Sequence, residues 1–331
     1  MRIAIIRLSS LGDIITTLVF LDFIKSIRRS LHITWIVDSK FAGIVFNSPL
    51  VDEVCAIPLR SSKKNKSLLI DIYKSLNALQ KFDIGMDFQG LLKSAIIGKL
   101  LKTNVFVGYS YDSSREGISS FLYTKKAYIP YHKHILERNF CIIKTAFNLD
   151  SSFNLSLLES RTNVIKPSTV ALENIGNFTH INVLFVIETS QLEKQYPIES
   201  FYSIATMLKN AGVKKIYLIW NENKEQIEQL SKMDCVFHLL PHLDFDYLKA
   251  LFLNIDLVIG GDTGITHLAW AMGVKSITLY GNTPINRVSL RGDNHISLCS
   301  KEHDTTIKGD FSINDINPLD VSKAAIKLLD L

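Results

Sequence analysis

The sequence predicts an α/β protein with two domains in tandem, each built around a mostly parallel sheet. Short runs of β-branched residues alternate with longer segments of helical period, which is the pattern of strand–helix–strand units. The alternation stops in a polar stretch at residues 150–169 and then starts again. A chain of 331 residues is also long enough to bury two cores. We therefore expect one domain at 1–160 and a second at 170–314.

Each element of the first domain follows from its own local pattern. Apolar β-branched runs predict the strands, and apolar residues three or four positions apart predict the helices. The expected strands are 3–7, 33–37, 83–87 and 105–108, and the expected helices are 14–28, 66–79 and 91–101.

The second domain repeats this rhythm. Its expected strands are 182–187, 215–220, 257–259 and 276–280, and its expected helices are 198–211, 222–232, 244–253 and 263–272. The segment 315–331 has Pro318 where a helix would start and an apolar stripe that includes Val321 and Leu328, so it is predicted to be a terminal helix.

Composition and charge exclude several classes of protein. Hydrophobic residues make up 47% of the chain and charged residues 21%, which is a globular balance rather than that of a disordered chain. The early apolar run from Ile14 to Leu21 lies between two aspartates and is far shorter than the roughly 20 residues that span a bilayer. The N-terminus has the pattern of a strand and not of a secretory signal, so we expect a cytoplasmic protein. The four cysteines form no C-x-x-C pair, which argues against a zinc site or a disulfide framework.

The net charge of +5 is unevenly distributed. Residues 1–165 carry 22 Lys and Arg against 13 Asp and Glu, whereas residues 166–331 carry 15 against 19. The first half also contains the run Arg60-Ser61-Ser62-Lys63-Lys64-Asn65-Lys66. Such runs are most often solvated, but they also bind anionic lipid surfaces or acidic saccharides. Nucleic acid is a weaker possibility, because aromatic residues are not interleaved with these cations and no nucleic-acid-binding motif is present.

The first loop with possible chemistry is Ser9-Ser10-Leu11-Gly12-Asp13, between the first strand and the first helix. It is neither G-x-G-x-x-G nor a Walker A loop, which disfavours binding of a dinucleotide. Asp13 is predicted to be the N-cap of the helix, with Gly12 relaxing the turn. The functional alternative is a general base at the carboxyl edge of the sheet.

Two loops of the second half could bind a phosphate group. Gly260-Gly261-Asp262-Thr263-Gly264 follows an apolar strand and begins a helix, so its amides and the helix dipole suit a diphosphate, although such glycine turns also occur without a ligand. His267 lies one turn further on, as either a ligand contact or a core histidine. In the other loop, Thr189 and Ser190 offer hydroxyls, and Lys194 offers a charge that could equally be solvated.

These motifs together resemble the bacterial lipopolysaccharide heptosyltransferases of glycosyltransferase family 9. The similarity is carried by the Ser9 to Asp13 loop, by Asp87-Phe88-Gln89-Gly90-Leu91-Leu92-Lys93-Ser94, by His134-Ile135-Leu136-Glu137-Arg138-Asn139 and by Asp262-Thr263-Gly264-Ile265-Thr266-His267. The motifs occur in order from Arg2 to about Tyr280, and the second resembles the type I branch more than type II.

The resemblance implies a GT-B fold, in which two Rossmann-like parallel-sheet domains face each other across a cleft. The N-terminal domain would bind the acceptor and the C-terminal domain the sugar nucleotide, with a last helix that often crosses back to the N-terminal domain. The implied donor is ADP-L-glycero-β-D-manno-heptose and the implied acceptor is the inner Kdo of Kdo2-lipid A. The anomeric centre would invert in one step, and no metal or cofactor would be required. An enzyme that acts on this acceptor would be located at the cytoplasmic face of the inner membrane.

The resemblance also assigns expected roles to residues. Asp13 would be the general base. The donor would be bound by Thr189, Ser190, Lys194, Asp262, Thr263, Gly264 and His267. The family's ribose-binding acid follows a Trp-Gly pair, but this chain has Trp220-Asn221, so both Glu225 and Glu222 remain candidates. The expected acceptor residues are Ser9, Ser10, Gly12, Arg60, Lys63, Lys64, Gln89, Lys93, Arg115 and Arg138.

Three alternatives stay open at this stage. The chain is an inner-core heptosyltransferase, a type II-like enzyme of a later core step, or a noncatalytic module that binds a nucleotide or glycolipid and keeps the same fold. A dinucleotide oxidoreductase is disfavoured by the missing glycine fingerprint.

Overall fold

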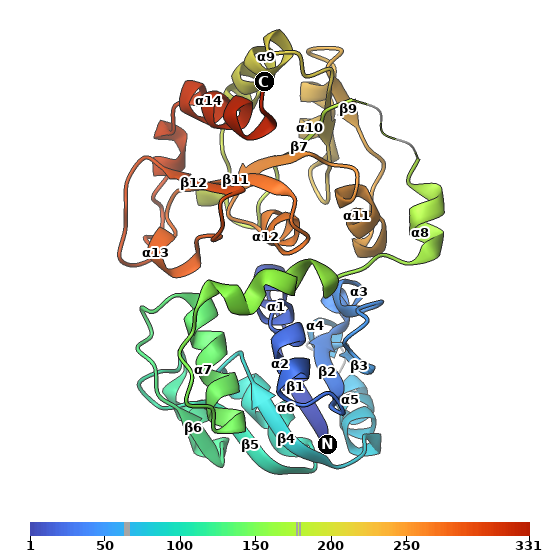
Figure 1. The fold of residues 1–331 in the computed structure, drawn as a ribbon, viewed down its shortest axis with the longest axis vertical. Helices are drawn as coiled ribbons and strands as arrows, with labels where there is room; N and C mark the ends of the chain where they lie inside the picture. Colours follow the sequence, from blue (N-terminus) through green and yellow to red (C-terminus); the bar gives the residue numbers. More distant parts are fainter. Residues whose placement is uncertain (63–66, 177, 179) are drawn as a thin grey trace. The chain divides into compact units, whose positions relative to one another are not determined.

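A computed structural model shows that the chain is built from two α/β units, Met1–Lys166 and Pro167–Leu331 (Figure 1). The structure describes residues 1–62, 67–176, 178 and 180–331. The division falls inside the polar stretch at 150–169. This stretch is not irregular as expected, because it contains the 3-10 helix η3 (Leu155–Asn163), which contacts α2 of the first unit.

The first unit contains a six-stranded parallel sheet in the order β3-β2-β1-β4-β5-β6 within the described residues. Its strands are β1 (Arg2–Ile6), β2 (His32–Asp38), β3 (Glu53–Ile57), β4 (Phe82–Asp87), β5 (Thr103–Tyr109) and β6 (Lys125–Ala127). Its α-helices are α1 (Leu11–Leu18), α2 (Leu21–Ile27), α3 (Ala42–Val45), α4 (Leu59–Ser62), α5 (Ser67–Ala78), α6 (Leu92–Leu100) and α7 (Ile135–Phe147).

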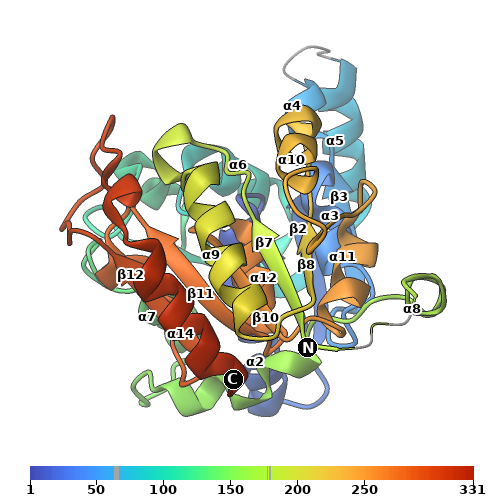
Figure 2. The ribbon, with the colours of Figure 1, turned by 90° about the horizontal axis from the view of Figure 1, so that it is seen from above.

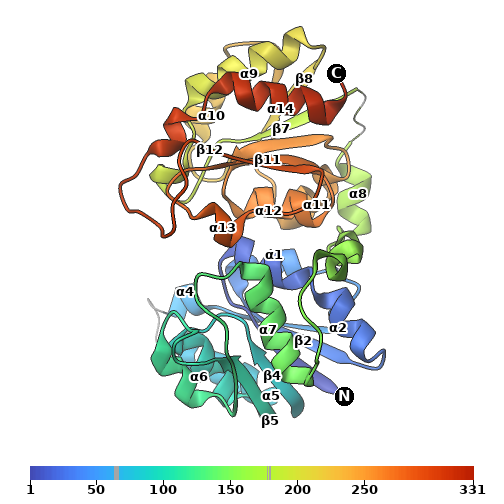
Figure 3. The ribbon, with the colours of Figure 1, turned by 60° about the vertical axis from the view of Figure 1, so that its left-hand side comes forward.

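Helices cover both faces of this sheet because its central strands are apolar on both sides. Ile3 to Ile6 of β1 are all fully buried. On one face, Ala4 and Ile6 pack with Ile72 of α5 and Ala95 of α6. Helix α7 contacts β4, β5 and α1 (Figure 3).

The second unit repeats this architecture. Its described strands form a six-stranded parallel sheet in the order β12-β11-β10-β7-β8-β9. The strands are β7 (Asn182–Val186), β8 (Lys215–Leu218), β9 (Phe237–Leu239), β10 (Leu257–Gly261), β11 (Lys275–Tyr280) and β12 (His295–Cys299). The α-helices are α8 (Thr169–Asn174), α9 (Ile198–Asn210), α10 (Lys224–Ser231), α11 (Phe245–Phe252), α12 (Gly264–Ala271), α13 (Ile285–Val288) and α14 (Pro318–Leu329).

One expectation about helices needs correction. The predicted helix 14–28 is two helices, α1 and α2, separated at Val19 and Phe20. The terminal helix α14 forms as predicted. It lies beside α9 (Figure 2), and its Val321, Ala325 and Leu328 are buried in the core of the second unit. Its apolar stripe is thereby covered within its own unit.

Each sheet has one place where the chain order reverses, between β1 and β4 in the first unit and between β7 and β10 in the second. Loops that leave the carboxyl ends of two such neighbouring strands diverge to opposite faces, which opens the crevice where α/β sheets bind ligands. The register places Ile6 beside Asp87, and Val186 beside Gly260. The loops singled out in the sequence therefore follow these central strands.

Candidate functional site

Asp13 is held at the start of α1. The helix begins at Leu11, so its N-cap is Ser10 and Asp13 is its third residue, not the N-cap as predicted. Asp13 Oδ2 accepts hydrogen bonds from the backbone N of Ser10 at 3.1 Å and from its Oγ at 2.8 Å. The bond from the Ser10 backbone N belongs to a capping box, in which the third helical residue reaches back to the cap. The capping interpretation is thus correct in kind, with its residue shifted by three.

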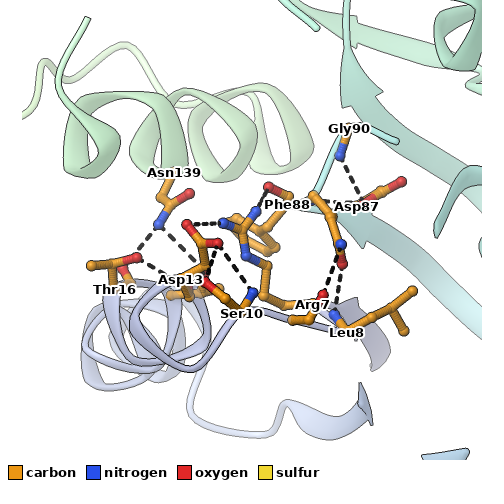
Figure 4. A network of polar contacts seen from close by, with 12 residues as sticks. Arg7, Leu8, Ser10, Asp13, Thr16, Asp87, Phe88, Gly90 and Asn139 are labelled. Atoms are coloured by element: carbon orange, nitrogen blue, oxygen red, sulfur yellow. Dashed lines mark hydrogen bonds and ion pairs between the residues drawn. The ribbon is translucent and has the colours of Figure 1, made fainter. Parts of the chain in front are cut away.

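The second oxygen of Asp13 pairs with Arg7, a residue that the sequence analysis did not select. Arg7 Nη2 lies 2.7 Å from Asp13 Oδ1, and Arg7 Nη1 donates to the carbonyl of Phe88 (Figure 4). The Arg7 side chain is only 5% exposed, whereas that of Asp13 is 41% exposed. The buried Arg7 therefore orients the Asp13 carboxylate, which remains accessible to solvent. The signal in the sequence was a lone arginine at the end of an apolar strand.

The loop after β4 fixes the loop after β1. Gln89 Oε1 accepts from the backbone N of Leu8 at 2.9 Å, and Gln89 Nε2 donates to Ser9 Oγ at 3.3 Å. Gln89 is itself held by Asp87, whose Oδ1 accepts from the Gln89 backbone N at 2.8 Å. The structure thus brings Ser9, Ser10, Asp13 and Gln89 together.

Asp87 is a fully buried anchor of this arrangement. Its Oδ2 accepts from Ser94 Oγ and from Tyr123 Oη, both at 2.8 Å. Burial raises the pKa of Asp87, and the hydrogen bonds from Ser94 and Tyr123 partly oppose this rise. The motif that begins at Asp87 therefore has a structural part in which a buried carboxyl holds the turn that carries Gln89.

The remaining expected acceptor residues have different positions. Arg138 is only 4% exposed, donates to the carbonyls of Pro130 and Ser113, and lies over the rings of Tyr109 and Tyr131. We therefore correct its assignment from acceptor contact to internal support. Gly12 is partly exposed, and Lys93 and Arg115 are exposed. The side chain of Arg60 and both Lys63 and Lys64 lie outside the described residues.

In the second unit, the paired glycines allow close packing of the protein against itself. A Cβ at Gly260 would lie 2.6 Å from Val186 Cβ, and a Cβ at Gly261 would lie 2.5 Å from the Lys194 carbonyl oxygen. Gly261 therefore lets the 3-10 helix η4 (Leu192–Lys194) approach β10. The sequence predicted that these glycines admit an anion, whereas the structure assigns both to internal contacts. Gly264 is the first residue of α12, with Thr263 as its N-cap.

Asp262, Lys194 and His267 form a compact charged cluster. Asp262 Oδ2 lies 2.5 Å from Lys194 Nζ, and Asp262 Oδ1 lies 3.1 Å from His267 Nε2. Asp262 and His267 side chains are each 8% exposed, and that of Lys194 is 19% exposed. Burial alone would raise the pKa of Asp262, but the hydrogen bond from His267 and the charge of Lys194 outweigh it and hold this pKa well below its usual range. Asp262 is therefore an anion at neutral pH.

The other expected donor-binding residues lie in two other segments of the same unit, after β7 and at the start of α10. Thr189 Oγ1 donates to the carbonyl of Gln191 at 2.5 Å, and Ser190 is exposed. Glu222 and Glu225 are both exposed, one before α10 and one in its first turn. The structure does not choose between these two acids.

Glu188 has a function in the fold that sequence reasoning did not resolve. Its carboxylate accepts from the backbone amides of Asn221, Glu222 and Asn223, which lead into α10. It therefore ties the loop after β8 to the end of β7.

No group of three or more His, Cys, Asp or Glu side chains in the described ranges is arranged to hold a metal ion. Likewise, none of the helices described here is long and apolar enough to cross a bilayer.

Comparisons with known proteins agree with this architecture. Lipopolysaccharide heptosyltransferase 1 of Campylobacter coli is 32% identical over 344 residues, covering 99% of each chain. Lipopolysaccharide heptosyltransferase 1 of Escherichia coli K12 is 25% identical, covering 89% of this chain and 92% of that protein.

Solved structures show the same fold. Escherichia coli heptosyltransferase WaaC with ADP-2-deoxy-2-fluoro heptose matches with a TM-score of 0.83 and 21% identity, covering 99% of each chain. A family 9 glycosyltransferase from Veillonella parvula matches with a TM-score of 0.84 and 20% identity, covering 99% of this chain and 97% of that one. The fold is therefore of the GT-B type, with two Rossmann-like units in tandem. The family model described as glycosyltransferase family 9 (heptosyltransferase) matches residues 70–313, and the chain is a member of that family.

Proposed function

We propose that this heptosyltransferase moves L-glycero-D-manno-heptose from ADP-L-glycero-β-D-manno-heptose to the inner Kdo of Kdo2-lipid A. The relatives named lipopolysaccharide heptosyltransferase 1 support this acceptor, and the WaaC structures with ADP and with a fluorinated ADP-heptose support this donor. The observation that carries the proposal is Asp13, a carboxylate oriented by Arg7 and Ser10 and still open to solvent.

The chemistry would be a single displacement with inversion. The Kdo hydroxyl attacks C1 of the heptose and its proton passes to Asp13. As the new C1–O bond forms, the bond from C1 to the diphosphate oxygen breaks, and ADP leaves with the electron pair. The start of α1 and the charge of Arg7 both favour ionised Asp13 and make it a weak base. Proton transfer to Asp13 would therefore occur late, when the attacking oxygen has become acidic.

The donor would be held by the second unit. The amides at the start of α12, near Thr263 and Gly264, suit a diphosphate, and Lys194 adds a positive charge. Asp262 would accept hydrogen bonds from heptose hydroxyls, and His267 keeps its carboxylate in place. Thr189 and Ser190 would contact the phosphates, and Glu225 or Glu222 the ribose. No metal or cofactor belongs to this proposal.

The acceptor would be held by the basic first half. Kdo2-lipid A carries carboxylates and phosphates, which Lys93, Arg115 and the run from Arg60 to Lys66 would attract. The enzyme would then work as a peripheral protein at the cytoplasmic face of the inner membrane, and nucleic acid is not among its partners.

The test is release of ADP from ADP-heptose in the presence of Kdo2-lipid A. Asp13→Asn should abolish turnover and leave ADP affinity within about 2-fold of the wild type, because Asn keeps the size of the side chain but cannot accept the proton at neutral pH. Asp22→Asn, which alters an acid in the first turn of the neighbouring helix α2, is the matched control and should keep normal turnover.

Three results would redirect the proposal. ADP binding by the wild type without ADP release would indicate a noncatalytic binding module. Transfer only to an acceptor that already carries one heptose would indicate a later core step. Near-normal turnover by Asp13→Asn would leave Asp13 with its capping function alone.

A further inference from the structure

We infer that Arg7 is a positioning residue for Asp13, which it orients from the end of β1. This inference rests on the proposed function of Asp13 as the acceptor of the proton. It concerns a residue that touches neither substrate in the proposal and acts through the carboxylate alone.

The Arg7 guanidinium is buried. A buried cation is costly unless a charge and hydrogen bonds compensate it. Asp13 supplies the negative charge at 2.7 Å and the carbonyl of Phe88 supplies an acceptor. Arg7 Nε is buried and has no partner among the described residues. The guanidinium therefore depends on Asp13, and the two side chains fix each other.

Arg7 and Ser10 hold different oxygens of the same carboxylate. Ser10 binds Oδ2 from within the helix cap, and Arg7 binds Oδ1 from the sheet. One contact alone would let the carboxylate rotate about its Cβ–Cγ bond. Because both contacts are present, its plane is set relative to β1, and Phe88 sets Arg7 relative to β4 (Figure 4).

The neighbouring elements carry other polar and titratable side chains. Helix α7 contacts α1, and its neutral Asn139 donates a hydrogen bond to the carbonyl of Thr16. Its Arg138 lies against Tyr109, whose pKa is raised to about 12 by burial, with Arg138 and Arg7 opposing the rise.

Two more titratable groups lie on these elements of the described chain. From the end of β4, the buried Asp87 hydrogen-bonds to Ser94 and Tyr123. His134, the N-cap of α7, accepts from the amide of Leu136. The ion pair from β1 thus supplies Asp13 with a positive charge at direct contact.

The experiment compares Arg7→Met, Arg7→Lys and the control Arg2→Met. Arg2 lies on the same strand and pairs with Glu53 at 3.3 Å, away from the Asp13 loop. Arg7→Met should lower kcat about 100-fold, the usual scale for a misplaced catalytic group, and leave the KM for ADP-heptose within about 2-fold. Arg7→Lys should recover part of kcat, and Arg2→Met should behave as the wild type.

The pH dependence separates positioning from plain packing. Arg7 favours the charged form of Asp13, so its removal raises the pKa of Asp13. The acid limb of the kcat profile should therefore move to higher pH in Arg7→Met. The same shift should appear in a carbon-13 NMR titration of labelled aspartate side chains, in which the Asp13 signal is identified by its loss in Asp13→Asn.

The NMR titration keeps this inference separate from the proposed function. If the wild type does not transfer heptose, the proposed function fails, and the titration still shows whether Arg7 acts on Asp13. An unchanged Asp13 titration in folded Arg7→Met would overturn the inference. If Arg7→Met does not fold, Arg7→Lys is the deciding variant, because a single ammonium cannot bridge Asp13 and Phe88 as the guanidinium does. An unchanged kcat and an unchanged Asp13 titration in Arg7→Lys would also overturn the inference.

Discussion

Replacing Lys194 by Met should expose how far the second unit depends on one ion pair. The change keeps most of the side-chain length and removes the charge that lies 2.5 Å from Asp262 Oδ2. Asp262 would stay buried and keep the hydrogen bond between its Oδ1 and His267, while its Oδ2 would lose the Lys194 ammonium. The predicted result is loss of stability at neutral pH.

The structure sets the scale of this loss. At 2.5 Å and an effective dielectric constant of about 20, the Coulomb attraction is about 7 kcal/mol. The cost of removing both groups from water cancels much of it, and breaking a buried pair by deleting one partner costs about 3–5 kcal/mol. Because Lys194 is 19% exposed, we expect the lower end, about 3 kcal/mol at pH 7.

The loss should shrink in acid. The pKa of Asp262 lies below its ordinary value of 3.8, so its ionised form contributes stability that is present above that value and is lost as pH falls toward the folded-state pKa. Without Lys194 this pKa is less depressed, and the variant has less to lose on acidification. The free energies of unfolding of the wild type and the variant should therefore converge below about pH 4.

Urea unfolding at pH 7 and at about pH 3, below the ordinary pKa of an aspartate, measures both quantities. In a Trp35→Phe background, the remaining tryptophans, Trp220 and Trp270, both lie in the second unit and report on it. Lys209→Met is the control, because Lys209 pairs with Asp234 on the surface of the same unit, where ion pairs contribute little. A loss no larger than that of the control, or an equal loss at both pH values, would refute the reasoning.

Two further predictions concern substrate binding. Changing Arg60, Lys63, Lys64 and Lys66 together to Gln should raise the KM for Kdo2-lipid A about 10-fold and leave the KM for ADP-heptose unchanged. The reason is that removing cations weakens attraction to an anionic lipid. Equal effects on both KM values in the kinetic assay would show that this run is not an acceptor site. Glu188→Ala should raise the KM for ADP-heptose about 5-fold, since three amides before α10 lose an acceptor and the acids Glu222 and Glu225 are held less firmly. A 5-fold change corresponds to about 1 kcal/mol, the contribution of one such hydrogen bond. Glu199→Ala, an exposed acid on α9, serves as its control, and a matching change there would contradict the prediction.

Strands were predictable where they lie at the centre of a sheet. Strands such as β1 and β7 are buried on both faces and consist of continuous apolar residues, which is a strong local pattern. The sequence analysis missed β3, β6, β9 and β12. All four have partly exposed positions and lie at or next to a sheet edge, and β6 is the short polar run Lys125–Ala127. Their pairing depends on neighbours that local sequence does not show.

Helices show the same limit. The break between α1 and α2 was missed because Ile14 to Leu21 is buried throughout, so no polar face marks where one helix stops. Helix α7 was treated as a motif only, although Leu136, Phe140 and Ile143 follow a helical period.

For the site, the loops were predictable and the side-chain partners were not. Asp13, Lys194 and Asp262 follow central strands, so chain order was enough to select their loops. The partnership of Arg7 with Asp13 depends on the turn between them, and the burial of Arg138 depends on Tyr109 and Tyr131, which come from other segments. The contacts of Arg138 are long-range, and the turn between Arg7 and Asp13 is itself held by Phe88 and Gln89 from the loop after β4.

The contact at Gly261 has a consequence for changing the donor preference of this enzyme by design. The Lys194 carbonyl occupies the space that any side chain at position 261 would need, and Thr189 Cγ2 lies 3.3 Å from the same point. Libraries that vary position 261 would therefore yield mostly misfolded protein. The exposed positions Ser190, Gln191 and Leu192 lie on the same loop without this constraint. Directed evolution toward other nucleotide sugars is best begun there.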